Sequence, residues 1–164
     1  MVILHEKLHT PDKKVFYEEL AAQMRSMLDS TVDILANMAN FSSLLFYTMP
    51  DVNWVGFYRW KNEELVLGPF HGKPACVRIA LGRGVCGTAA ERRATVLVED
   101  VRAFPGHIAC DAASRSEIVV PLIKDHQLLG VLDIDSPLEC RFDNDDKRGL
   151  ERLVAIFLEQ QYAE

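Results

Sequence analysis

The stretch that decides the fold is Val52-Asn53-Trp54-Val55-Gly56-Phe57-Tyr58-Arg59-Trp60. It is short and rich in β-branched and aromatic residues, which is typical of a strand. Before it, apolar residues recur with the spacing of a helix, and after it short apolar runs are separated by turn residues. The chain therefore changes near residue 52 from helices to a sheet.

Helices are predicted at both ends of the chain. The first covers residues 12–28, directly after a proline–aspartate pair that marks its start. The second follows Ser30 and Asp33, which we interpret as a capping pair, and ends before residue 50. The last follows Asp143, a suitable N-cap for the apolar stripe behind it.

Short strands are predicted between these helices. Besides the aromatic strand, they cover residues 65–70, 76–80, 95–98, 117–123 and 128–133. Tight turns join most of the six strands, which indicates a mostly antiparallel sheet. Helices, then a meandering sheet, then a closing helix describe an α+β domain. Because 164 residues is an ordinary length for one domain, we expect residues 1–164 to form a single domain.

Composition and charge limit the classes of partner. The net charge of -6 and the pI near 5.4 leave no surplus of Lys and Arg to neutralise phosphates, so nucleic acid is not expected as a partner. The first residues lack the cationic leader of a secretory signal, and no stretch is long and apolar enough to span a bilayer. We therefore expect a cytoplasmic protein without a membrane partner, in a compartment where structural disulfides are rare.

Cys110 is the strongest candidate for a reactive residue. It lies among small residues in the segment 100–115, the longest one without a clear period, and such loops are often functional. A small molecule could reach a thiol there, and His107 or backbone amides could favour its thiolate form. The alternative is that Cys110 is a small buried apolar residue, as free cysteines often are.

Two further cysteines are flanked by glycine or proline turns. Cys86 follows a glycine-rich turn and opens a short helix, where the helix N-terminus should stabilise a thiolate. Cys76 lies in a predicted strand, and the spacing does not show which two cysteines come within bridging distance. Cys140 receives no predicted role. The absence of a C-x-x-C pair argues against zinc, so no metal site is predicted.

Three carboxylates lie in otherwise apolar strands. Asp133 and Asp135 are two residues apart, so they should share one face of a strand, and Glu117 precedes another apolar run. If that face is enclosed, repulsion and burial raise the pKa of at least one carboxyl, which then keeps a proton to donate. The alternative is a strand end open to solvent. Trp54 and Tyr58 also share a face, as plain core or as one wall of a pocket.

Six segments carry a resemblance to a known family. They are Asn53–Tyr58, Gly68–Cys76, Gly82–Ala89, Gly106–Asp111, Ser116–Val119 and Gly130–Ser136. In this order they resemble the free methionine-(R)-sulfoxide reductases, enzymes built on a GAF domain. The match spans the whole chain, and three cysteines in register make it specific. It implies a GAF-like fold, with the six-stranded sheet flanked by the N-terminal and C-terminal helices.

The resemblance also implies roles for particular residues. Cys110 matches the nucleophile, Cys86 the resolving cysteine, and Cys76 an auxiliary one. The substrate pocket would be lined by Trp54, Tyr58, Glu117, Asp133 and Asp135.

The implied reaction converts free L-methionine-(R)-sulfoxide to L-methionine through a cysteine sulfenic acid and an intramolecular disulfide, which thioredoxin reopens. No cofactor is expected. The residue types suit this chemistry, because a sulfoxide sulfur is attacked by a thiolate only when its oxygen receives a proton. Acidic side chains also suit the ammonium group of a free amino acid.

Two other functions remain open at this stage. A GAF sensor module that binds a small ligand would leave the cysteines without a role, and a general thiol peroxidase would have little use for Trp54 and the acids. A sensor normally reports to an output domain, and this chain has no residues left for one, which favours the enzyme. The sequence leaves the oligomeric state open, with a homodimer among the options.

Overall fold

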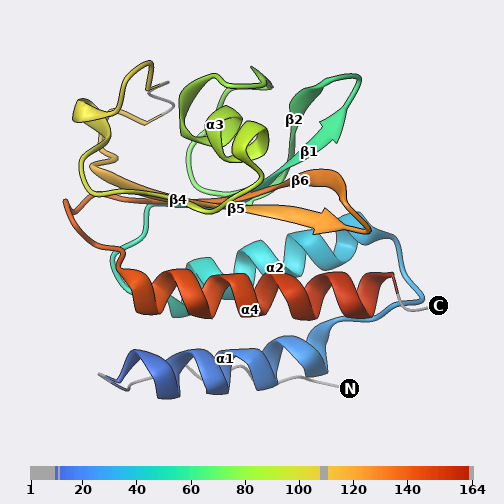
Figure 1. The fold of residues 1–164 in the computed structure, drawn as a ribbon. Coiled ribbons are helices and arrows are strands. Elements are labelled where there is room, and N and C mark those ends of the chain that lie inside the picture. The colour runs from blue at the N-terminus through green and yellow to red at the C-terminus, as the bar shows by residue number, and fades with distance from the viewer. Residues whose placement is uncertain (1–9, 11, 108–110, 163–164) are drawn as a thin grey trace.

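The computed structural model describes residues 10, 12–107 and 111–162. Their six strands form one antiparallel sheet in the order β3-β2-β1-β6-β5-β4, which confirms the predicted α+β class (Figure 1). The strands are β1 (Trp54–Lys61), β2 (Glu64–His71), β3 (Arg78–Ala80), β4 (Val96–Val98), β5 (Ser116–Lys124) and β6 (Gln127–Ser136).

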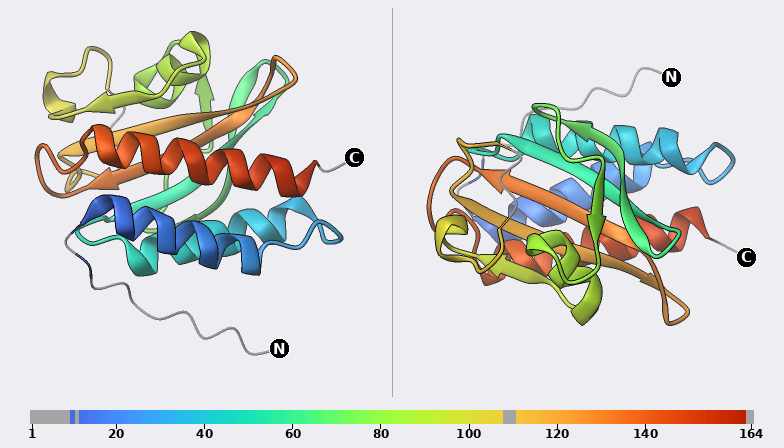
Figure 2. Two further views of the ribbon diagram at one scale, coloured as in Figure 1. Left: turned by 60° about the horizontal axis from the view of Figure 1, so that its bottom comes forward. Right: turned by 90° about the horizontal axis from the view of Figure 1, so that it is seen from above.

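Helices cover both faces of this sheet. On one face lie α1 (Lys13–Met27), α2 (Ile34–Thr48) and α4 (Asn144–Gln161), with α1 outermost (Figures 1 and 2). On the other face lie the short helix α3 (Gly84–Arg92) and the loops around it, including a 3-10 turn at Val101–Ala103. No helix among the described residues combines the length and the apolar character needed to cross a bilayer.

Aspartates begin the three long helices. The carboxylate of Asp12 accepts hydrogen bonds from the backbone of α1, and Asp143 forms a reciprocal capping box with Asp146 at the start of α4. Asp33 caps α2 by accepting from the backbone N–H of Leu35. Ser30 lies in the turn before this cap, so the predicted capping pair reduces to Asp33.

Three strand predictions differ from the structure by two residues or more at one end. The aromatic strand predicted at 52–60 is β1, which runs from Trp54 to Lys61. The strand predicted at 76–80 begins only at Arg78, where its paired register with β2 starts, although Val77 still accepts a hydrogen bond from the backbone N–H of Leu67 at 2.9 Å. Cys76 therefore lies in the segment before β3 rather than in a strand. The strand predicted at 128–133 continues to Ser136, because β6 is central and pairs with β1 and β5 on its two sides.

Strict alternation along the central strands separates two cores. On β6, Leu132 and Ile134 face the long helices, whereas Val131 faces α3. The same alternation places Ile118 toward the long helices and Val119 toward α3. Asp133 and Asp135 share the parity of Val131, so their side chains belong to the α3 face.

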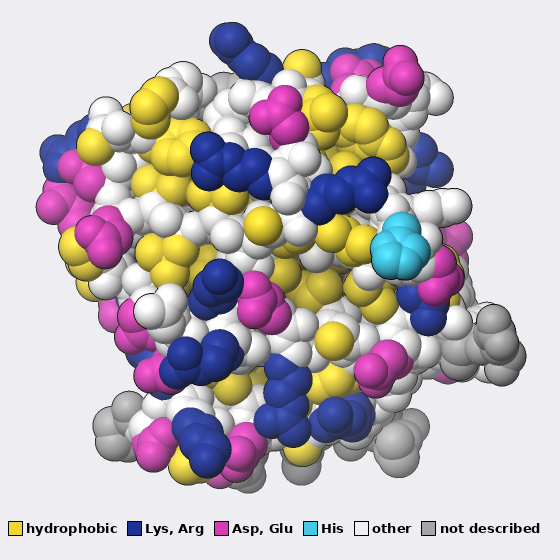
Figure 3. Space-filling model, in the orientation of Figure 1, with side chains coloured by type: hydrophobic (Ala, Val, Ile, Leu, Met, Phe, Trp, Pro, Cys, Tyr) yellow, Lys and Arg dark blue, Asp and Glu magenta, His cyan; other side chains and the backbone are white. Residues whose placement is uncertain are grey.

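An ion-pair cluster joins α1 to the start of α4 on the helical face. The buried Asp146 carboxylate accepts hydrogen bonds from Tyr17 Oη at 2.8 Å and from Lys13 Nζ, and it pairs with Arg141 Nη1 at 3.3 Å. Lys13 also contacts Asp143 at 2.8 Å. We call these five residues the helix cluster. Outside it, Lys and Arg side chains are interspersed with Asp and Glu side chains on the face drawn in Figure 3.

Candidate active site

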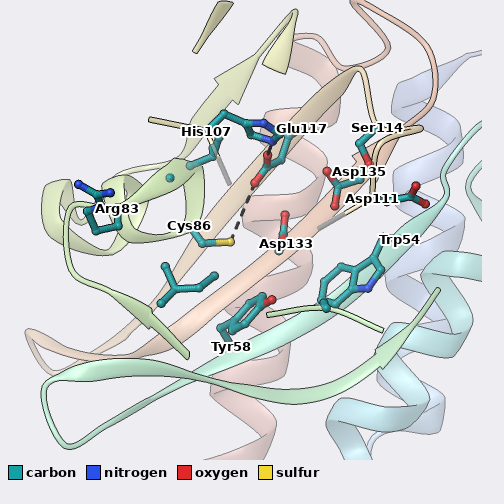
Figure 4. Close-up of a pocket in the computed structure, with 14 residues that line it drawn as sticks. Trp54, Tyr58, Arg83, Cys86, His107, Asp111, Ser114, Glu117, Asp133 and Asp135 are labelled. Carbon is teal, nitrogen blue, oxygen red and sulfur yellow. Dashed lines mark hydrogen bonds and ion pairs between the residues drawn. The ribbon is translucent and has the colours of Figure 1, made fainter. Parts of the chain in front are cut away.

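A pocket of about 430 Å³, counted with its opening to solvent, lies between the sheet and α3 (Figure 4). Its walls come from β1, β5, β6, the start of α3 and two loops. The side chains that give it chemical character are aromatic or polar: Trp54, Tyr58, Arg83, Cys86, His107, Asp111, Ser114, Glu117, Asp133 and Asp135. Every described residue that the sequence predicted for the site, apart from Cys76, therefore lines one pocket.

Three carboxyl groups share the floor of this pocket. Strand pairing sets Glu117 opposite Asp135, and it sets Asp133 between Val119 on one side and Gly56 on the other. The side chains of Glu117 and Asp133 are buried, at 5% and 6% exposure for the two residues. The structure thus confirms that Asp133 and Asp135 share a face, and that this face is enclosed rather than open to solvent.

Burial changes the ionisation of these acids. Loss of water, followed by the charge of Asp135, raises the pKa of Glu117 well above its ordinary value. Loss of water and the charge of Glu117 do the same to the pKa of Asp133, and burial with the charge of Asp133 raises the pKa of Asp135. Since the three interact, their protons belong to the group, and ionisation of all three together is disfavoured.

Cys86 contacts the acids from the first turn of α3. Its buried Sγ lies 4.0 Å from Glu117 Oε1. The helix packs close to the sheet because Gly87 has no side chain: a Cβ there would lie 2.4 Å from the carbonyl oxygen of Ala80. This close packing carries Cys86 into the pocket.

The predicted thiolate at Cys86 is wrong for this structure. Burial, then the charges of Asp133 and Glu117, raise the pKa of the Cys86 thiol well above its ordinary value. The helix N-terminus is present as predicted, but its partial charge is outweighed by lost hydration and by two carboxylates in a site of low dielectric. Cys86 is a protonated thiol near neutral pH.

Two stacked aromatic rings form the opposite wall. The rings of Trp54 and Tyr58 lie 6.0 Å apart at 23°, and Trp54 also stacks on Phe70 at 5.3 Å. A Cβ on Gly56 would lie 2.6 Å from the Trp54 ring, so only glycine lets the indole lean along the strand. Trp54 and Tyr58 are therefore a pocket wall as well as part of the core.

The same rings hold the segment that contains Cys76. Trp54 Nε1 donates to the carbonyl oxygen of Lys73 at 3.0 Å, and Tyr58 Oη donates to that of Cys76 at 3.1 Å. Cys76 is half-buried, and its neighbour Ala75 lines the pocket. Cys140 is an exposed free thiol in the turn before α4.

Cys110 lies outside the described residues, but residues on both sides of it line the pocket. His107 Nε2 is 3.6 Å from Glu117 Oε2, and burial lowers the pKa of this histidine. Asp111 accepts hydrogen bonds from Lys73 Nζ at 3.1 Å and from the backbone N–H of Ala113 at 2.9 Å. The Lys73–Asp111 ion pair thus joins the loop before Cys76 to the loop after Cys110.

Three polar pocket residues had no predicted role: Arg83, Asp111 and Ser114. Arg83 lines the pocket at the start of α3, and Asn53 donates to Ser114 Oγ at 3.1 Å and to Asp111 at 3.3 Å. Aspartate side chains often accept from the backbone N–H two residues on, as Asp111 does from Ala113, so Asp111 carried a local signal. No local pattern marks Arg83 or Ser114, whose places depend on the tertiary structure.

Comparison with known proteins places this pocket in a family. Residues 23–161 match the model of the GAF domain. The chain is 51% identical over 144 residues to the free methionine-R-sulfoxide reductase of Escherichia coli, covering 88% of this chain and 87% of that protein. This chain is a GAF domain of the free methionine-(R)-sulfoxide reductase family.

Solved structures agree with that assignment of the GAF domain. The X-ray structure of the free methionine-R-sulfoxide reductase from Neisseria meningitidis, in complex with its substrate, superposes with a TM-score of 0.91 at 43% identity, covering 98% of this chain and 96% of that one. The reduced enzyme of Staphylococcus aureus gives a TM-score of 0.85 at 50% identity, covering 88% and 94%. The resemblance inferred from the six sequence segments is confirmed.

Proposed function

We propose that this protein reduces free L-methionine-(R)-sulfoxide to L-methionine. The observation that carries the proposal is the enclosed group of three acids, whose raised pKa values keep a proton available in a pocket flanked by the loop of Cys110. The family supports it, because similar proteins bear the name of this activity and one is solved with its substrate.

The reaction needs a nucleophilic sulfur and a proton donor at one site. The thiolate of Cys110 attacks the sulfoxide while one of Glu117, Asp133 and Asp135 protonates the sulfoxide oxygen. The sulfur–oxygen bond of the substrate breaks, the protonated oxygen becomes bonded to Cys110 Sγ as a sulfenic acid, and methionine is released. Cys110 is oxidised by two electrons and the sulfoxide is reduced by two. Without the proton the oxygen would be a poor leaving group.

The charges of the pocket fit a free amino acid. The acids supply a counter-charge for an ammonium group, which a peptide-bound methionine lacks. Arg83 and the N-terminus of α3 line the same pocket and suit a carboxylate. Because repulsion prevents three adjacent carboxyls from all ionising, one can hold the ammonium group while another keeps the proton for catalysis. The Trp54 ring suits the S-methyl group.

Recycling requires a second thiol and an external reductant. We propose that Cys86 captures the sulfenic acid of Cys110 as a disulfide with loss of water, that Cys76 is auxiliary, and that thioredoxin reopens the bridge. The attack needs the thiolate of Cys86, and the pKa of this thiol is raised. Disulfide formation should therefore become faster as the pH rises toward that pKa.

The test follows NADPH consumption in the presence of thioredoxin and its reductase. Addition of free L-methionine-(R)-sulfoxide should consume NADPH, and the (S) epimer should react much more slowly or not at all. Absence of turnover with intact thiols would contradict the reductase and favour a sensor module.

Cysteine variants then assign the roles. Cys110→Ser should abolish even a single turnover, whereas Cys86→Ser should release one methionine per chain and then stop under thioredoxin. Cys76→Ser and Cys140→Ser are the matched controls, and both should continue past the first turnover under thioredoxin. If Cys76→Ser stops after one methionine and Cys86→Ser does not, the resolving role passes to Cys76.

A further inference from the structure

We propose that the pocket floor is also a binding site for one divalent cation of the zinc class, held by Cys86 Sγ and by the carboxylates of Glu117 and Asp133, and that this ion excludes the substrate. The binding part of this inference is independent of the proposed function. The exclusion of substrate rests on it.

The geometry of the three ligand atoms supports the site. One atom each from Cys86, Glu117 and Asp133 lies within 4.8 Å of the others, and Cys86 Sγ is 4.0 Å from Glu117 Oε1. With bonds of about 2.3 Å to sulfur and about 2.0 Å to oxygen, ligand atoms around a tetrahedral zinc ion are about 3.5 Å apart. Side-chain shifts of roughly 1 Å or less would close the site around an ion.

A second observation points to a ligand at this place. Among the described residues, Asp133 Oδ1 has no hydrogen-bond partner, although Asp133 is only 6% exposed and faces the pocket. A buried carboxylate oxygen without a donor is unfavourable unless a cation or a donor reaches it. A metal ion between Asp133 and Cys86 would satisfy this oxygen directly.

The ligand types select the class of ion. A thiolate is a soft ligand and disfavours magnesium and calcium, whereas sulfur with carboxylate oxygen suits zinc, cobalt and cadmium. His107 Nε2 lies 3.6 Å from Glu117 Oε2, so a fourth ligand is near.

The site differs from the zinc site that the sequence argued against. Its ligands come from α3, β5 and β6. The two strands pair with each other and α3 packs on the sheet, so no ion is needed to hold these elements in place. Three protein ligands leave a coordination position open, as in exchangeable sites rather than closed structural ones. The ion would therefore come and go while the fold persists.

Binding must displace protons. The thiol of Cys86 loses its proton, and so does any protonated carboxyl that becomes a ligand, so affinity should rise with pH. The titratable and charged groups that face this floor are Tyr58, Arg83, Cys86, His107, Asp111, Glu117, Asp133 and Asp135. The ion would occupy the acids that the substrate needs as proton donor and as counter-charge.

Cobalt binding tests the site without reference to activity. Reduced, chelator-treated protein titrated with Co²⁺ should bind one ion and show thiolate-to-cobalt charge-transfer absorption in the near ultraviolet. Asp133→Asn keeps the side-chain shape, and circular dichroism checks its fold. Replacing a residue that only hydrogen-bonds to a metal ligand usually lowers metal affinity by about 10- to 100-fold. Loss of the Asp133 ligand itself should therefore weaken cobalt binding by at least that factor.

Cysteine variants locate the sulfur ligand. Cys86→Ser should lose the charge-transfer band, whereas Cys76→Ser and Cys140→Ser should keep it. A band that survives in Cys86→Ser, or cobalt affinity unchanged in Asp133→Asn, would overturn the site.

Zinc inhibition tests the exclusion of substrate. Release of methionine in a single turnover, without thioredoxin and its metal-binding dithiol, should slow as Zn²⁺ is added and recover with excess substrate or chelator. If cobalt binds but zinc does not inhibit, the ion does not exclude the substrate, and only the metal site itself is supported. If the metal-free protein releases no methionine, the proposed function is wrong. The cobalt titration would still test the metal site in that case.

Discussion

The two faces of the sheet each bury carboxyl groups, but in opposite ways. In the helix cluster, Asp146 is buried against Lys13, Arg141 and the Tyr17 hydroxyl. In the pocket, Glu117 and Asp133 lie beside a third acid, and the basic group that the described residues bring within 4 Å of them is His107, whose Nε2 is 3.6 Å from Glu117 Oε2. A buried acid with cations fixes one element to another, whereas a buried acid with other acids stores a proton.

The pKa shifts show the same contrast. Partial burial works against ionisation of Asp143 in the helix cluster, but hydrogen bonds from Lys13 and the α4 backbone outweigh it and lower its pKa from 3.8 to about 2. In the pocket, burial and repulsion act together and raise the pKa values of Glu117, Asp133 and Asp135. Four substitutions or conditions would break or sharpen this comparison.

The largest effect should come from Asp133→Asn. The amide cannot pass on a proton, so single-turnover methionine release should slow by roughly 10²- to 10⁴-fold, the usual size of general-acid catalysis. The matched control is Asp145→Asn, an exposed acid on α4, which should leave the rate unchanged. If the single-turnover rate of Asp133→Asn stays within about threefold of the wild-type rate, Asp133 is not the proton donor.

The next effect concerns stability. Asp146→Asn leaves Arg141 and Lys13 without their buried counter-charge, so the free energy of unfolding should fall by about 3 kcal/mol. Urea denaturation measures this change, and the activity of the folded fraction should remain. Asp145→Asn is again the control and should stay within about 0.5 kcal/mol of wild type. If Asp146→Asn and Asp145→Asn lower the free energy of unfolding by the same amount, the helix cluster adds no specific stability.

The pH dependence should have opposite signs on the two faces. Asp133 has a raised pKa in the folded state, so its contribution to stability is present below its ordinary pKa and is lost as the pH rises. The stability of Asp133→Asn relative to wild type should therefore increase as the pH rises above 4. Denaturation curves across this range measure the difference, and a difference that shrinks with pH would contradict the raised pKa.

The smallest effect should come from Asp143→Asn. Asparagine keeps the N-cap, so only the exposed ion pair with Lys13 is lost, and stability should change by less than about 1 kcal/mol. Because the folded pKa is lowered to about 2, the difference should be present above pH 4 and vanish as the pH falls toward 2. A difference that grows in acid would exclude the ion pair as its cause.

Alternation along the strands made half of the site predictable. Two-residue spacing was enough to place Asp133 with Asp135, and a spacing of four placed Trp54 with Tyr58. Helix caps were equally local, as Asp143 shows. These features depend on residues that are neighbours in the chain.

The remainder depended on tertiary contacts. Glu117 joins the aspartates only through the register of β5 on β6, which no short pattern encodes. The ionisation of Cys86 was mispredicted because the helix N-terminus is a local feature, whereas burial and the charges of Asp133 and Glu117 arise from packing. Arg83 and Ser114 entered the pocket without any local signal.

The aromatic wall has a mechanical consequence. Trp54 and Tyr58 donate to the carbonyl groups of Lys73 and Cys76, so one strand positions both the ring surface and the backbone of a thiol-bearing segment. Displacement of the indole would break its bond to Lys73, whereas Tyr58 would still hold the carbonyl group of Cys76. The wall of the pocket and the position of that cysteine are thereby linked through β1.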